Sequence, residues 1–466
     1  MSRRFAFVFF AIIISQTTFA QKKATEKPAE VSRFEKLELF NKVLFLIESQ
    51  YYRPVDTEKL IQGAIRGMMN TLDPHSAFLD QQVFAKMQED TKGEFGGLGI
   101  EVTQKDGVLV VITPIEDTPA FKAGIKSGDK IVEINHEPTI GLTLDEAVDR
   151  MRGKIGEKIT IGISREGLDG IKQFELTRQI IKIDAVKDEL LAGQFSYIRL
   201  SQFQQNAGEQ IASALKKHRK ESEKNGGLKG IIFDLRSNPG GLLDEAVNVS
   251  SIFLKDGIVV STEGRDPKQK EIRYVKKNGH KELDLPMVVL VNGSSASASE
   301  IVAGALQDSK RAIIMGSTTF GKGSVQNLIK IDESQGVKLT IAQYMTPNNR
   351  KIQAIGIVPD IELDEYEGAW SESGKRDGRY LREVDLRNHL TATIETEEEK
   401  KAREKKEYED RKKRIEEIKR SRDKKKNNNI VAESDDGRIV PPSEDYQVLQ
   451  AMNYIKTINI YEKMKK

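Results

Sequence analysis

The sequence predicts an α/β fold with a β-rich inserted domain and an N-terminal helical region. Between residues 195 and 315, short apolar runs with the length of buried strands alternate with helical stretches, as in an α/β domain. Residues 93–165 instead contain short alternating strands separated by glycine turns. Residues 34–69 carry apolar side chains at helical spacing.

The composition fits a large protein without metal or thiol chemistry. Its 466 residues suggest roughly three domains, on a prior of about 150 residues each. The 74 basic and 71 acidic residues nearly cancel, so no single-sign field favours nucleic acid as a partner. The chain has no cysteine, which excludes disulfides, a thiol nucleophile and thiolate metal sites. With five histidines and no H-E-x-x-H pattern, a catalytic zinc site is also not expected, and we predict no cofactor.

Residues 1–20 have the three parts of a secretory signal peptide. Residues 1–4 are basic, residues 5–14 are apolar but short for a membrane span, and residues 18–20 form a small-residue cleavage signal. We therefore expect an exported protein, periplasmic or otherwise extracytoplasmic. An uncleaved segment that anchors the chain to a membrane is the alternative.

Residues 21–92 form the predicted N-terminal helical region. After a polar linker, helices are expected at residues 34–48 and 56–69, with Asp56 as a plausible N-cap. The run Leu-Asp-Pro-His-Ser at residues 72–76 ends the second helix, because the residue before proline is pushed out of the helical region. The apolar face of the first helix would be formed by Leu37, Phe40, Leu44 and Ile47.

Residues 93–165 contain a candidate peptide-binding loop, Gly97-Leu98-Gly99-Ile100. Such a loop exposes successive backbone N–H groups that can hold a terminal carboxylate, and the strand edge that follows can pair with a peptide. A helix at residues 144–151 would form the other wall of the groove. The pattern resembles a PDZ domain.

Residues 166–365 form the predicted core domain. Core strands are expected at residues 195–200, 230–236, 286–291 and 312–315, with a helix at 207–217. Strands at residues 158–163 and 174–178 complete the preceding domain and return the chain to this core, and residues 339–346 form one more strand.

Ser297 and Lys322 are the candidate nucleophile and base. Ser297 lies where the strand at residues 286–291 meets a helix at residues 300–306, and unpaired N–H groups at such a junction can stabilise negative charge. Lys322 stands between two glycines. A lysine can deprotonate a hydroxyl at neutral pH only if burial lowers its pKa.

Two other readings of these residues are weaker. A Ser-His-Asp triad needs a histidine, and none of the five stands in an apolar strand-end setting: they are His75, His136, His218, His280 and His389. Residues 316–322 nearly complete a phosphate-binding P-loop. That motif needs Ser or Thr directly after the lysine, and Gly323 occupies the position.

The runs at residues 295–308 and 319–326 resemble the carboxyl-terminal processing peptidases, also called tail-specific proteases. The resemblance implies a serine endopeptidase with a crotonase-like α/β core, an inserted PDZ domain and an N-terminal helical region that often takes part in self-association. It assigns Ser297 as nucleophile, Lys322 as base and Gln326 as the residue that orients the lysine. Ser294 and Asn349 depart from the family pattern, since many members have glycine at both positions.

The same resemblance implies an oxyanion hole and a class of partner. The loop at residues 237–241 would supply the backbone N–H of Gly240 or Gly241, together with that of Ala298. The expected partners are protein or peptide substrates bound through their C-termini, with the PDZ domain gating activity. A homo-oligomer and a regulatory adaptor are left open, and a non-catalytic PDZ scaffold that only binds protein tails is the alternative function.

Residues 366–466 form a charged C-terminal region. Residues 397–426 mix Glu, Lys and Arg at a spacing that supports an exposed helix, and Tyr408 is their only aromatic residue, so a stacking platform for nucleic acid is missing. Residues 427–444 are predicted to be disordered. Residues 445–464 are predicted to form an amphipathic helix that packs on the core or on another subunit.

Overall fold

The computed structural model describes residues 32–465 with several gaps. The gaps are residues 106, 116, 166–169, 183, 267, 269, 365–379, 387, 394–398, 400, 404, 407, 408 and 410–439. The predicted signal peptide, the linker at residues 21–31, most of the charged stretch 397–426 and residues 427–439 lie outside the described residues. The chain divides into two compact units, Met1–Ile65 and Arg66–Lys466. Within the described ranges, no helix has the length and apolar character needed to cross a membrane.

The two N-terminal helices form where the sequence predicts them. Helix α1 spans Arg33–Gln50 and begins with a capping box between Ser32 and Glu35. Helix α2 spans Thr57–Asn70, and Oδ1 of Asp56 accepts the N–H of Glu58 at 3.0 Å, as expected for an N-cap. Helix α1 buries none of its residues, so its apolar side chains stay exposed or half-exposed.

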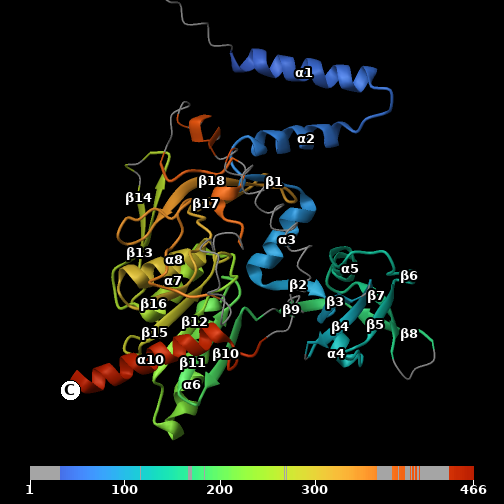
Figure 1. Ribbon diagram of the computed structural model, residues 1–466. Coiled ribbons are helices and arrows are strands. Elements are labelled where there is room, and N and C mark those ends of the chain that lie inside the picture. The colour runs from blue at the N-terminus through green and yellow to red at the C-terminus, as the bar shows by residue number, and fades with distance from the viewer. Residues whose placement is uncertain are drawn as a thin grey trace, which may run out of the picture. The chain divides into compact units, whose positions relative to one another are not determined.

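A six-stranded sheet forms the centre of the core domain (Figure 1). Its first two strands are antiparallel and the others are parallel. In spatial order the strands are β10 (Val186–Leu191), β11 (Phe195–Leu200), β12 (Gly230–Asp234), β15 (Met287–Val291), β16 (Ile313–Gly316) and β19 (Ile361–Glu362). The four predicted core strands are thus neighbours in one sheet, which agrees with the expected α/β class.

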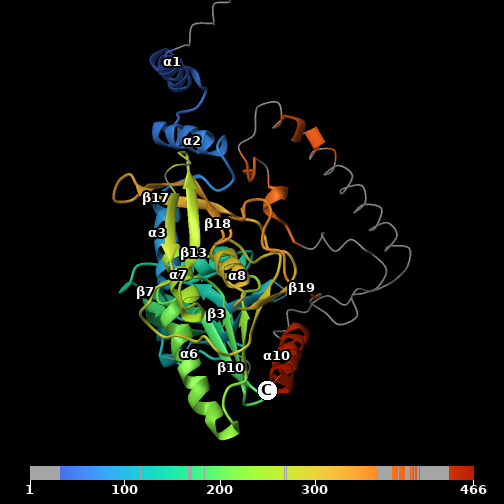
Figure 2. The ribbon, with the colours of Figure 1, turned by 90° about the vertical axis from the view of Figure 1, so that its left-hand side faces the viewer.

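Helices cover both faces of this sheet, so its central strands β12 and β15 are buried at every position. Ile231 and Phe233 face the main core, which also holds apolar residues of α6 (Ala207–Ser222), α7 (Leu243–Phe253) and α8 (Ala298–Asp308). The residue between them, Ile232, faces a second cluster formed with helix α10 (Tyr446–Lys465). The predicted C-terminal helix therefore packs on the core, on the side opposite α6 (Figure 2).

An antiparallel sheet of five strands adjoins the loop at residues 321–323. Four of its strands follow the order β1 (Ala77–Leu79), β18 (Gly336–Met345), β13 (Ile258–Gly264) and β14 (Lys270–Tyr274), and β17 (Ser324–Lys330) also pairs with β18. Strand β1 follows the Leu-Asp-Pro-His-Ser turn, and β17 begins two residues after Lys322. The sequence did not predict β13, β14, β17 or α7.

The inserted domain contains a sheet and two short helices, and a third helix leads into it. The sheet strands are β3 (Ile100–Lys105), β4 (Val108–Pro114), β5 (Lys130–Ile134), β7 (Lys158–Ser164) and β8 (Lys172–Thr177), and β6 (Glu137–Pro138) pairs with β5. The helices are α3 (Gln81–Lys92), which precedes the domain, α4 (Pro119–Lys122) and α5 (Leu144–Met151). Strand β8 pairs with β7, so the sheet continues past the predicted boundary at residue 165. Strands β2 (Glu94–Gly97) and β9 (Gln179–Lys182) pair where the chain enters and leaves the domain.

Candidate active site

Ser297 occupies a strained turn at the start of α8. Its backbone has φ 56° and ψ −112°, a region that residues other than glycine seldom adopt. Two hydrogen bonds of Ser295 stabilise the turn: its Oγ donates to the carbonyl of Leu235 at 2.8 Å and accepts the N–H of Asn292 at 2.9 Å. Strained backbone of this kind costs roughly 1–3 kcal/mol and clusters at active sites.

The predicted oxyanion loop lies directly against this turn. A Cβ atom added to Gly240 would lie 2.8 Å from the Cβ of Ser297 and 3.0 Å from the backbone nitrogen of Ala298. The N–H of Gly240 donates to Oδ1 of Asn238 at 2.9 Å. The N–H groups of Gly241 and Ala298 have no acceptor among the residues that the structure describes. Of the two glycines that the sequence left open, Gly241 is therefore the one with an available donor.

Lys322 lies on a loop whose backbone is held in place by buried side chains. The N–H of Gly321 donates to Oε1 of Glu300 at 2.7 Å, and the N–H of Lys322 donates to Oε2 of the same carboxylate at 2.9 Å. The N–H of Gly323 donates to Oε1 of Gln353 at 3.0 Å. Three successive amides of the Gly-Lys-Gly motif are thus satisfied by side chains.

Burial lowers the pKa of the Lys322 ammonium below its ordinary value of 10.5. The charge of Lys338 acts in the same direction, whereas nearby carboxylates act in the opposite one and do not reverse the shift. These carboxylates belong to Glu383, Glu300 and Asp73. A lowered pKa is the property that a lysine needs to serve as a base.

Glu300 connects the two halves of the site and was not singled out from the sequence. Its carboxylate is fully buried and accepts four hydrogen bonds, two on each oxygen. The donors are the N–H groups of Ser297, Gly321 and Lys322 and the hydroxyl of Thr319. Burial raises the pKa of Glu300 to about 7, although these donors favour the ionised form. The Ser-x-x-Glu spacing of a capping box was the signal in the sequence that could have identified it.

Gln326 lies near the site but makes other contacts. Its Nε2 donates to Ser324 Oγ at 2.9 Å and to Thr340 Oγ1 at 3.4 Å. Within the described part of the chain, no hydrogen bond joins Lys322 Nζ to Gln326 or to Ser297 Oγ. Catalytic hydrogen bonds in unliganded enzymes are often long and tighten only with substrate. The pairing of these three side chains therefore stays a prediction.

The predicted peptide-binding loop has the expected surroundings. Leu98 and Gly99 use their carbonyls to accept the N–H groups of Ala120 and Ile115, at 3.0 and 2.9 Å. Their own N–H groups have no acceptor among the described residues. Strand β3 lies at the edge of its sheet, and α5 carries the half-buried apolar side chains of Leu144 and Val148.

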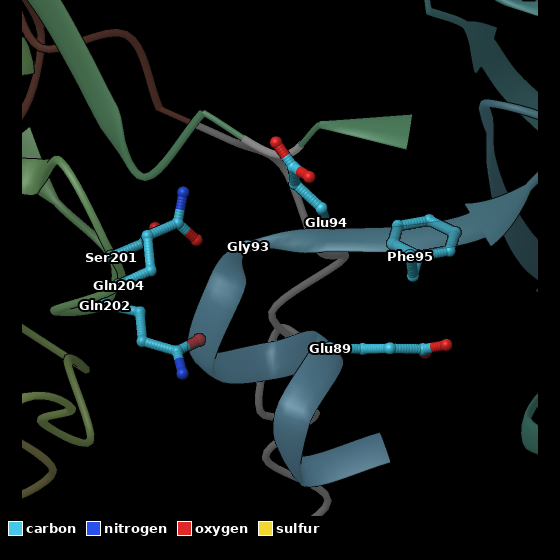
Figure 3. Close-up of a pocket in the computed structure, with 7 residues that line it drawn as sticks. All are labelled: Glu89, Gly93, Glu94, Phe95, Ser201, Gln202 and Gln204. Atoms are coloured by element: carbon cyan, nitrogen blue, oxygen red, sulfur yellow. The ribbon is translucent and has the colours of Figure 1, made fainter. Parts of the chain in front are cut away.

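The entry to the inserted domain contacts a segment that pairs with the predicted oxyanion loop. Gly93 ends α3 with φ 69°, and a Cβ atom there would lie 2.4 Å from the side chain of Gln204 (Figure 3). The neighbouring Phe203 pairs with the oxyanion loop: its N–H donates to the carbonyl of Gly240 at 2.8 Å, and its carbonyl accepts the N–H of Leu242 at 2.7 Å. A cavity of about 60 Å³ lies at this contact, room for little more than water.

Comparisons with known proteins agree with this architecture. Residues 194–363 match the model of peptidase family S41, residues 96–174 match the PDZ domain, and residues 6–83 match the activating protease CtpB N-terminal domain. A carboxy-terminal-processing protease of Bartonella bacilliformis is 41% identical over 399 residues, which cover 85% of this chain and 90% of that protein. The chain belongs to the S41 family of serine peptidases.

Two further relatives carry related names. The carboxy-terminal processing protease CtpA of Bacillus subtilis is 36% identical over 72% of this chain and 70% of its own length. The solved structure of a photosystem II D1 C-terminal processing protease is 31% identical, with a TM-score of 0.43, over 72% of this chain and 87% of that chain. Ser297, Lys322 and Glu300 all lie inside the S41 match of this peptidase. No group of acidic or histidine side chains among its described residues is arranged to hold a metal ion.

Proposed function

We propose that this S41 peptidase cleaves proteins near their C-terminus, with Ser297 as nucleophile and Lys322 as general base. The observation that carries the proposal is the backbone arrangement of the two residues. Ser297 stands in a strained turn beside two N–H groups that have no acceptor among the described residues. The loop of the half-buried Lys322 binds the same carboxylate as the backbone of Ser297.

The proposed reaction follows the usual steps of acyl transfer. Neutral Lys322 takes the proton of Ser297 Oγ, and this oxygen attacks the carbonyl carbon of the scissile bond. The N–H groups of Gly241 and Ala298 bind the oxyanion. Protonated Lys322 then gives its proton to the departing amine. Water, deprotonated by Lys322, releases the acyl group and restores the serine. No step requires a metal or an organic cofactor.

Single and double substitutions test the pair. We expect Ser297→Ala and Lys322→Ala each to abolish peptide cleavage, with circular dichroism showing a folded protein. Combining them should cost little more than either alone, because the two residues act as one unit. A Lys322→Ala protein that kept most of its turnover at neutral pH would rule out the proposed base. If the unmodified chain cleaved no substrate, the remaining candidate function would be that of a non-catalytic scaffold that only binds protein tails.

We further infer that the PDZ domain binds the free C-terminus of the substrate. The N–H groups of Leu98 and Gly99, the edge of β3 and the apolar side of α5 support this mode of binding. Substrates that end in small or apolar residues should be cleaved faster than their amidated forms, since amidation removes the carboxylate. Val148→Glu should remove the preference, and the exposed neighbour Asp149→Ala serves as the control. Equal rates for free and amidated tails in the unmodified enzyme would reject this inference.

The PDZ domain is also proposed to gate the active site. The contact of Gly93 with Gln204, next to the Phe203 that pairs with the oxyanion loop, supports a gate. A separate peptide with a free apolar C-terminus should then accelerate cleavage of a short substrate that lacks such a tail. If the domain only tethers substrates, the added peptide leaves that rate unchanged.

Export remains a proposal that rests on residues 1–20 alone. The expected result is a mature protein in the periplasmic or extracytoplasmic fraction that begins after residue 20. Intact mass and N-terminal sequencing of the protein from its native cells measure this directly. A chain that retains its first residues in a membrane fraction would support the anchor instead.

A further inference from the structure

A segment beyond the S41 match lies against the loop that carries Lys322. We name residues 380–386 and 388–393 the strap; the match ends at residue 363. The N–H of Glu383 donates to the carbonyl of Phe320 at 3.1 Å, two residues before Lys322. A Cβ atom on Gly293 would lie 2.5 Å from the Cβ of Tyr380, so the strap also packs on the turn before Ser297.

The strap places a buried carboxylate behind the lysine loop. Glu383 is fully buried, and its Oε2 lies 2.8 Å from Nε2 of His75. Its Oε1 accepts a hydrogen bond from Nε2 of Gln353 at 2.8 Å. An unpaired buried carboxylate would be costly, so these two partners hold the side chain of Glu383 in place.

Gln353 connects this carboxylate to the residue next to the base. Its Nε2 donates to Glu383 and to the carbonyl of Leu390, another strap residue, at 2.9 Å. With the amide nitrogen directed at these two acceptors, the amide oxygen accepts the N–H of Gly323 at 3.0 Å. A Cβ atom on Gly323 would lie 2.3 Å from the backbone nitrogen of Gln353, so the two backbones are in direct contact.

His75, the other partner of Glu383, belongs to a turn that connects the strap to the surroundings of Gln326. Asp73 Oδ1 accepts the N–H of His75 at 2.8 Å and the hydroxyl of Thr340 at 3.1 Å. Thr340 Oγ1 in turn accepts Nε2 of Gln326 at 3.4 Å. The Leu-Asp-Pro-His-Ser turn therefore contacts the surroundings of Gln326 and the strap together.

We propose that Glu383 is a positioning residue for the general base: it orients the Gln353 amide, and Gln353 holds the Gly323 N–H beside Lys322. Glu300 accepts the N–H groups of Gly321 and Lys322, so the strap supplies, through Gln353, the last of three backbone restraints on the Gly-Lys-Gly loop. The inference rests on the proposed role of Lys322.

The charge of Glu383 gives a second, electrostatic route to the same lysine. The charged groups around Lys322 are Lys338 on β18, Glu300 on α8, Asp73 in the turn and Glu383 in the strap. A carboxylate near a lysine favours the protonated ammonium and so raises its pKa. Replacing Glu383 by glutamine should therefore lower the pKa of Lys322 and move the acid limb of the activity profile to lower pH.

A double-mutant cycle tests the positioning route. Glu383→Ala and Gln353→Ala should each lower kcat between about 10-fold and about 100-fold with KM little changed, because a misplacement of about 1 Å can cost that much. If Glu383 acts through Gln353, the double variant should be no slower than the slower single variant. Fully multiplied losses would overturn the proposal.

The electrostatic route is tested without catalysis. In the Ser297→Ala background, the rate at which acetic anhydride labels Lys322 is followed against pH by mass spectrometry. Glu383→Gln, which keeps the size of the side chain, should shift the midpoint of labelling to lower pH. Glu282→Gln is the matched control, since Glu282 is equally buried and pairs with Arg219; it should leave the midpoint in place.

The outcomes separate this inference from the proposed function. An active Lys322→Ala protein would reject the proposed role of Lys322 as the base, independently of the results for the strap. With Lys322→Ala inactive, an unchanged labelling midpoint in Glu383→Gln together with unchanged kcat in Gln353→Ala would overturn the strap proposal alone. If Glu383→Ala fails to fold, the glutamine variant and Gln353→Ala still decide between the two results.

Discussion

The backbone N–H groups of Ser297 and Lys322 donate to the same oxygen, Oε2 of Glu300, at 2.8 and 2.9 Å. One buried carboxylate thus links the start of α8 to the loop of the proposed base. The other oxygen, Oε1, binds Gly321 and Thr319. Ser297 and Lys322 lie 25 positions apart in the sequence. The shared carboxylate of Glu300 holds their two segments together, as does the hydrogen bond from the N–H of Phe320 to the carbonyl of Ser295 at 3.0 Å.

Glu300→Gln should inactivate the peptidase without unfolding it. Each oxygen of Glu300 accepts two hydrogen bonds, so an amide nitrogen in either place would face two donors. The resulting shift of Ser297 or Lys322 should lower kcat by about 100-fold. Steady-state kinetics measures the loss, and Glu282→Gln, a buried carboxylate away from the site, should keep its kcat. Normal turnover in Glu300→Gln would show that this link is dispensable.

The activity profile should rise with pH through the pKa of Lys322. Only the neutral amine accepts a proton, and burial lowers its pKa, so the rise in kcat/KM should be centred below 10.5. Lys338 contributes to the lowering. Lys338→Met should therefore move the rise to higher pH, whereas Lys330→Met, at the far end of β17, should not. An identical profile for both variants would argue against Lys322 as the titrating group.

Gly240→Ala should disrupt the oxyanion loop. Gly240 has φ 105°, and its new Cβ would lie 2.8 Å from the Cβ of Ser297 and 2.9 Å from the carbonyl oxygen of Ala296. Gly257→Ala is the matched control, because Gly257 has φ 100° but no atom near its Cβ position. Both variants carry the backbone strain of alanine at positive φ. The additional loss of kcat in Gly240→Ala relative to Gly257→Ala measures the crowding at the site. We expect this loss to be at least about 100-fold, as for a lost oxyanion contact.

Arg236→Met should destabilise the core and loosen α10. Arg236 donates to both oxygens of the fully buried Asp234, at 2.9 and 2.6 Å, and also pairs with Asp445 just before α10. Removing one partner of a buried ion pair costs about 3–5 kcal/mol. Urea unfolding measures this cost. Arg273 pairs with the exposed Glu271 through a side chain that is 42% exposed, so Arg273→Met should change stability by less than about 1 kcal/mol.

The same ion pair predicts an acid-sensitive contribution to stability. Burial alone would raise the pKa of Asp234, but the hydrogen bonds and charge of Arg236 hold it below its ordinary value of 3.8. A depressed folded-state pKa contributes stability above 3.8 that is lost as pH falls through the lower folded value. The unfolding free energy of Arg236→Met should therefore depend less on pH at the acid end than that of the unmodified protein. Parallel curves for the two proteins would contradict this assignment.

Local signals in the sequence were enough for the fold class and for the location of the site. Mostly apolar runs of strand length placed all four core strands, because the central strands of a parallel sheet covered on both faces are buried on both sides. The resemblance at residues 295–308 and 319–326 identified the family, which the relatives confirm. The same motifs located Ser297 and Lys322, whose roles stay predictions.

Tertiary structure alone decided what surrounds these residues. Glu300, Gln353, Glu383 and His75 are far apart in the chain and carry no pattern that joins them, yet their buried polar atoms must find partners and so meet around one loop. Strands β14 and β17 were missed because most of their residues are exposed or half-buried, since an antiparallel sheet with one exposed side needs fewer apolar residues per strand. The choice of Gly241 over Gly240 likewise required the position of Asn238. Sequence periodicity records which face of an element is apolar, whereas hydrogen-bond partners depend on distances that only the folded chain establishes.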